Sequence, residues 1–88
     1  MNKLINKYWK TRDLYLAAYL FARGAIIVGI QADESKVVFT FLDSLNRQNW
    51  MDEFRSGRPL IDARIFTCAI RTLKHKAIDA LMEDHGSN

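Results

Sequence analysis

Cationic side chains gather in one stretch of the sequence, where they could bind phosphate groups. Residues 55–76 contain six arginine or lysine residues and a single acidic residue, Asp62. On a helix, Arg64, Arg71 and His75 fall within about 40° of one another when viewed down the axis. Guanidinium groups bind phosphate oxygens through paired hydrogen bonds. The pattern indicates a basic helix face that could contact nucleic acid, with an ordinary solvated helix face as the alternative.

The candidate phosphate ligands all come from this stretch, and such contacts would position a nucleic-acid backbone without reading its sequence. They are Arg55, Arg58, Arg64, Arg71 and Lys74.

A second group could bind a partner protein. Arg12, Tyr15, Tyr19 and Arg23 share the narrower side of a helix predicted for residues 11–24. Tyrosine and arginine are enriched in interface hot spots, and the same pair can stack on unpaired bases. The alternative places both tyrosines at the edge of the core, with their hydroxyls in water.

The residue types and their spacing give little support for a catalytic or metal-binding site. The single cysteine, Cys68, cannot form an internal disulfide, and His75 lies about two helical turns from it, too far to activate the thiol. The acidic residues match no calcium loop, and the chain has no glycine-rich phosphate-binding motif. We therefore expect a protein that is not an enzyme and holds no metal or cofactor.

The location predicted for the protein is the cytoplasm, because a lone cysteine suits a reducing compartment. No apolar run reaches the roughly 18 residues that span a bilayer, and residues 1–10 lack the apolar core of a secretion signal. We expect no membrane partner.

The first elements are a helix and a hairpin. Thr11 can cap a helix that ends at Gly24, where a left-handed backbone would close the last turn. The β-branched and aromatic runs at 26–30 and 37–42 predict one antiparallel hairpin. Gly29, inside the first run, indicates a bulge or a close backbone approach.

Two helices follow the hairpin. Asp43 or Ser44 can cap a helix that continues to Phe54, and Asp62 can cap the last helix, from Ala63 to about Met82. The apolar stripe of this last helix comprises Phe66, Ala69, Ile70, Leu73, Ala77, Ala80 and Leu81.

The resulting fold class is α+β, in the order helix, hairpin, helix, helix, with the helices packed on one face of a two-stranded antiparallel ribbon. We expect a basic extension at residues 1–10, one domain at residues 11–83, and a frayed tail at residues 84–88.

The chain also resembles a short family of bacterial and phage-related proteins known only as a domain of unknown function. The residues that carry the resemblance lie in order between positions 11 and 76 and are mostly helix caps and core positions. They are Thr11-Arg12-Asp13-Leu14-Tyr15-Leu16-Ala17-Ala18, Leu20, Gly24, Val38-Phe39-Thr40-Phe41, Phe54-Arg55-Ser56-Gly57, Leu60-Ile61-Asp62-Ala63-Arg64, Phe66 and Leu73-Lys74. The resemblance implies the same fold and an origin in bacteria or their mobile elements, and it assigns no catalytic residue.

Three functions fit these observations. The first is a small binding module that associates with nucleic acid or a nucleoprotein complex through the basic face of the last helix. The second is a phage- or mobile-element-encoded interaction factor, an inhibitor or adaptor of a host protein such as a defence nuclease complex, acting through the Arg12, Tyr15, Tyr19, Arg23 face or an exposed hairpin edge. The third is a homodimeric structural module.

Overall fold

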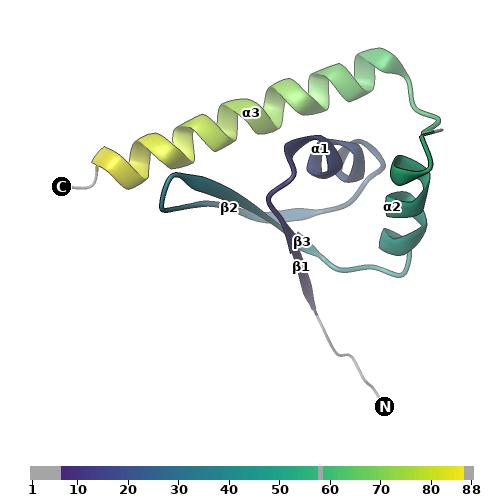
Figure 1. The fold of residues 1–88 in the computed structure, drawn as a ribbon, viewed down its shortest axis with the longest axis horizontal. Coiled ribbons are helices and arrows are strands. Elements are labelled where there is room, and N and C mark those ends of the chain that lie inside the picture. Colours follow the sequence, from purple (N-terminus) through teal and green to yellow (C-terminus); the bar gives the residue numbers. More distant parts are fainter. Residues whose placement is uncertain (1–6, 58, 87–88) are drawn as a thin grey trace.

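The computed structural model describes residues 7–57 and 59–86. The elements in chain order are β1 (Tyr8–Thr11), α1 (Leu14–Ala22), β2 (Ile27–Asp33), β3 (Lys36–Leu42), α2 (Arg47–Arg55) and α3 (Ala63–Gly86) (Figure 1). The predicted α+β class is confirmed. The predicted two-stranded ribbon is wrong, because the sheet has three antiparallel strands in the order β1-β3-β2.

The strand absent from the prediction is β1. Trp9 pairs with Phe41 and Thr11 pairs with Phe39. β1 therefore widens the sheet along the edge of β3 that does not pair with β2. β1 includes the last three residues of the predicted basic extension, and the first six residues of that extension lie outside the described part of the chain.

The hairpin forms as predicted, with longer strands and a tighter turn. The register between β2 and β3 shifts between Ile27 and Gly29, which confirms the predicted bulge. The turn consists of Glu34 and Ser35, whose φ angles of 52° and 71° are both positive. Two such residues make the type I′ geometry that matches the twist of a hairpin, although neither is a glycine or asparagine.

The caps of α1 differ from the prediction at one end. Asp13, not Thr11, is the N-cap, because its carboxylate accepts from the amides of Tyr15 and Leu16 at 3.0 and 3.1 Å. The hydroxyl of Thr11 instead accepts from the amide of Asp13. At the other end Gly24 has the predicted positive φ, 108°.

α1 is buried on nearly every side. Five consecutive residues, 16–20, have exposed fractions of 4% or less. Figure 1 shows why: α1 is enclosed by α3, α2 and the sheet. A helix in that position has little solvent-exposed surface, so Tyr19 is buried although helical spacing predicts it on the same side as the exposed Tyr15. Phe21 is partly exposed at the end of the helix.

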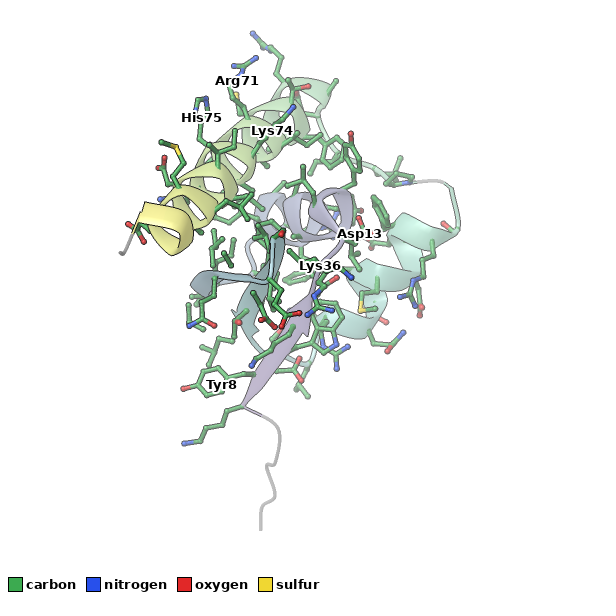
Figure 2. All side chains as sticks on the ribbon, turned by 60° about the vertical axis from the view of Figure 1, so that its left-hand side comes forward. Tyr8, Asp13, Lys36, Arg71, Lys74 and His75 are labelled. Carbon is green, nitrogen blue, oxygen red and sulfur yellow. The ribbon has the colours of Figure 1, made fainter. Side chains whose placement is uncertain are left out.

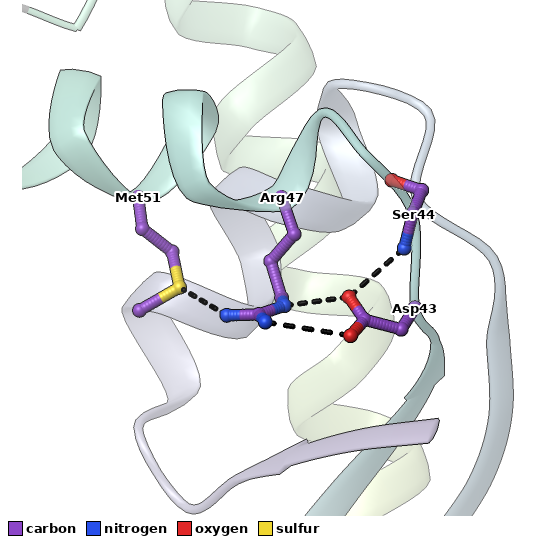
Figure 3. Close-up of polar contacts among 4 residues, drawn as sticks. All are labelled: Asp43, Ser44, Arg47 and Met51. Carbon is purple, nitrogen blue, oxygen red and sulfur yellow. Dashed lines mark hydrogen bonds and ion pairs between the residues drawn. The ribbon is translucent and has the colours of Figure 1, made fainter. Parts of the chain in front are cut away.

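A polar cluster joins α2 to β1 and β3. The cap predicted for α2 at Asp43 or Ser44 is wrong, since the helix begins after Asn46 without a side-chain cap. Asp43 instead accepts from the Nε of Arg47 at 2.6 Å and from the amide of Ser44 at 2.9 Å (Figure 3). The Arg47 guanidinium also lies 4.9 Å from the centre of the Trp9 ring.

This arrangement lowers the pKa of Asp43 below its ordinary value. The main cause is the hydrogen bond from Arg47, and burial opposes it. The ionised form of Asp43 is therefore favoured in the folded protein.

α3 begins at its predicted cap and extends past its predicted end. Asp62 accepts from the amide of Arg64 at 2.7 Å, and the helix continues to Gly86 rather than stopping near Met82. Ala69 and Leu73 are buried against the core. The helices thus cover one face of the sheet, while Tyr8, Lys10 and Gln31 lie exposed on the strands.

Candidate nucleic-acid interface

Three of the predicted phosphate ligands share the outer side of α3. Arg64, Arg71 and Lys74 are exposed, because the buried stripe of the helix, which includes Ala69 and Leu73, points the other way. Figure 2 shows Arg71 and Lys74 projecting from α3. We refer to these three residues as the α3 basic face. Within residues 7–57 and 59–86, none of their side chains forms an ion pair.

Arg55, a further predicted ligand, does not belong to this face. Arg55 is exposed at the end of α2 and is separated from α3 by the connection at residues 56–62. Arg58 lies outside the described residues. The sequence placed all five in one group because they are close along the chain, but the change of direction between the two helices separates Arg55 from the rest.

Two cations that the sequence did not connect with this face lie beside it. A cavity of about 400 Å³ is bordered by Lys74 on α3, Lys36 at the start of β3 and Arg12 before α1. Its apolar lining includes Leu14, Val37 and Ile78, and we refer to it as the α3–β3 cavity. Figure 2 shows Lys36 and Lys74 on the same side of the molecule.

The electrostatics of the cavity favour an anion. Arg12 is 3.7 Å from Asp33, but both side chains are more than half exposed, so this ion pair contributes little. Asp13 is occupied as the cap of α1. In the described part of the chain, Lys36 and Lys74 have no acidic partner. No signal in the sequence connects Lys36 with Lys74, since their place on the border of one cavity depends on how α3 crosses the hairpin.

The predicted protein-interaction face is not a single exposed surface, which corrects the prediction. Tyr15 is 57% exposed and Tyr19 only 1%. The Tyr19 hydroxyl donates to Oε1 of Glu53 at 2.8 Å. Arg23 turns to the same carboxylate at 3.6 Å and lies 5.9 Å from the centre of the Trp50 ring. Tyr19 and Arg23 thus hold α1 against α2, and Tyr15 and Arg12 do not form a patch with them.

The position of Tyr19 raises the pKa of its hydroxyl above the ordinary value. Burial is the largest cause, followed by the hydrogen bond to Glu53 and the negative charge of Glu53, whereas Arg23 acts in the opposite direction. Tyr19 is therefore held in its neutral form as a hydrogen-bond donor inside the protein.

A second groove runs along the free edge of β2. Its volume is about 700 Å³, and five consecutive residues, 26–30, line it together with the side of α3 that carries Lys76, Asp79 and Glu83. Successive residues of a strand face opposite ways, so a cavity that touches all five follows the edge of the strand. Ile26 and Val28 are each more than half exposed there.

The remaining candidates from the sequence are Cys68 and the possible metal ligands. Cys68 is exposed and lines an open groove with Phe21 and Ile65. In the part of the chain that the structure covers, no three His, Cys, Asp or Glu side chains come together as metal ligands would.

Comparison with known proteins identifies the family. The family described as Domain of unknown function (DUF5659) matches residues 6–79. The chain belongs to this family. The match covers all three strands and most of α3, which confirms the resemblance to a family of unknown function. Searches of curated proteins and of solved structures gave no match to this DUF5659 domain.

Among its described helices, none has the length and apolar character needed to cross a membrane.

Proposed function

We propose that the protein is a non-enzymatic module that binds nucleic acid, alone or in a nucleoprotein complex, through the α3 basic face. The observation that carries the proposal is the exposure of Arg64, Arg71 and Lys74 along one helix without acidic partners in the described residues. Positive side chains that form no ion pair within the fold are available to bind a phosphate backbone. Arg55 would add a contact from α2.

The spacing of these residues suits a polyanion. Arg64 and Lys74 are ten residues apart in the sequence, which corresponds to about 15 Å along a helix axis. DNA carries a phosphate about every 3.4 Å along each strand, so several phosphates fall within reach of the three side chains. Binding of this kind fixes the position of the nucleic acid without specifying its sequence.

The test is a titration of labelled single-stranded and duplex oligonucleotides by fluorescence anisotropy, from about 50 to 200 mM salt. We expect affinity to fall as salt rises, and we expect Lys74→Ala to reduce the slope of log K against log salt by about 1. Lys76→Ala is the matched control, because it removes the same charge from the opposite side of α3, where Lys76 lines the β2 groove. The absence of binding at low salt, or binding that does not depend on salt, would overturn the proposal.

A second candidate function is the capture of an extended segment of a partner protein along β2. The groove at this edge favours it, because an unpaired strand edge offers backbone donors and acceptors, and the exposed Ile26 and Val28 offer apolar contacts. A stoichiometric partner that survives nuclease treatment and is lost in Val28→Lys would support this candidate. Loss of every partner after nuclease treatment would exclude it.

A further inference from the structure

We propose that the α3–β3 cavity holds one unpaired nucleotide of a single-stranded nucleic acid. This inference rests on the proposed function and adds the form of nucleic acid that the protein prefers. The proposal is based on three cations from separate parts of the chain that border one apolar cavity. They are Arg12 from the segment before α1, Lys36 from β3 and Lys74 from α3.

The border of the cavity suits a phosphate. Lys36 and Lys74 have no acidic partner among the described residues, so each ammonium group can donate to a phosphate oxygen. Arg12 is held only by an exposed pair with Asp33 at 3.7 Å, which an incoming phosphate can replace. Lys74 also belongs to the α3 basic face, so a strand lying along that face would pass directly over the cavity.

The lining of the cavity suits a base. Leu14, Val37 and Ile78 present hydrocarbon beside the cations, and Ile78 is 46% exposed. The face of a base is apolar and gains free energy when it is covered by apolar side chains. The volume of about 400 Å³ lies within the range of about 300–1,000 Å³ that is typical of small-ligand sites.

A cavity with a cationic border and an apolar lining favours single strands over duplexes. In a duplex, the faces of the bases are stacked on one another, and taking one out costs a few kcal/mol. An unpaired strand can place a base in the cavity and a phosphate on its border without that cost. A flat basic surface would not make this distinction.

The experiment compares labelled oligo(dT) with a duplex of equal length in the same salt, by fluorescence anisotropy with the intact chain. We expect oligo(dT) to bind at least about five-fold more tightly than the duplex. Lys36→Ala and Ile78→Glu should each weaken oligo(dT) binding by about five-fold or more and reduce the preference for it. Lys36→Ala changes only an exposed side chain, so it remains informative if Ile78→Glu perturbs the fold.

Two variants are matched controls. Met82→Glu places the same charge one turn further along α3 on a more exposed residue that does not line this cavity, and Lys76→Ala removes a lysine from the other side of the helix. We expect both to retain the preference for oligo(dT). If single strand and duplex bind equally and Lys36→Ala behaves as Lys76→Ala does, this inference is wrong while the proposed function stands. If neither nucleic acid binds at low salt, or if only anionic lipid vesicles bind, both are wrong.

Discussion

Replacing Tyr19 with phenylalanine should lower the free energy of unfolding by about 1–1.5 kcal/mol, because it removes the hydrogen bond to Glu53 and keeps the ring. A hydrogen bond to a charged acceptor contributes about 1.5–3 kcal/mol. The Glu53 side chain is 39% exposed, so water can replace part of the lost interaction and the expected loss falls at or just below the lower limit of that range. The ring contacts of Tyr19 with Phe54 and Phe66, at 5.5 and 6.4 Å between ring centres, do not need the hydroxyl.

The assay is urea and thermal unfolding followed by circular dichroism. For a domain of this size, a loss of about 1 kcal/mol lowers Tm by about 4–8 °C. Tyr15→Phe is the control, since it removes a hydroxyl from an exposed tyrosine four residues earlier on α1 and should leave Tm unchanged. If Tyr19→Phe is as stable as the parent, or if the control loses as much, the hydroxyl does not hold α1 against α2.

Three further predictions concern stability. The raised pKa of Tyr19 means that the folded protein keeps this proton more tightly than the unfolded chain, so stability should fall as pH rises above 10.0, and less steeply in Tyr19→Phe. The lowered pKa of Asp43 means that stability should fall as pH drops below 3.8, and Asp43→Asn should flatten that fall in urea unfolding measured across acidic pH. The double replacement Glu34→Asn, Ser35→Gly should stabilise the protein by about 1 kcal/mol, because both residues have positive φ; an unchanged or lower Tm would contradict the strain.

Sequence predicted the parts of the fold that depend on local signals. The hairpin follows from β-branched and aromatic runs, the bulge from Gly29, the end of α1 from Gly24, and the start of α3 from Asp62. Each of these depends on the backbone preference of a residue or its immediate neighbours. Such preferences are usually kept in the fold, although the cap signals of Thr11 and Asp43 are not, since both side chains make other hydrogen bonds.

The parts that sequence missed depend on contacts between distant segments. β1 is a strand of four residues whose hydrogen-bonding partners on β3 lie some thirty residues away. Tyr8, Trp9 and Thr11 have high strand propensity, but four residues are too few to show a clear alternating pattern, and the pairing with β3 cannot be read from the segment itself. Helical spacing groups Tyr19 with Arg12, Tyr15 and Arg23, which predicts an exposed position for its ring. The structure buries it because α1 is enclosed by three other elements and Glu53 supplies an acceptor.

In the candidate site, too, the part that depends on local spacing could be predicted, and the part that depends on contacts between distant segments could not. The α3 basic face could be predicted, because helical spacing places Arg64 and Arg71 on one side of a helix. The α3–β3 cavity could not be, because Lys36 and Arg12 reach it only through the crossing of α3 over the hairpin. The predicted face containing Tyr19 failed because the periodicity of one helix does not reveal how many neighbours it has.

The most direct test of where the protein binds is a titration of the isotopically labelled chain with oligo(dT), followed by backbone amide chemical shifts. We predict that the largest shifts come from amides around Lys36, Arg71, Lys74 and Ile78, with little change along residues 26–30. Shifts confined to the β2 groove, or no shifts at low salt, would contradict the assignment of nucleic-acid binding to α3.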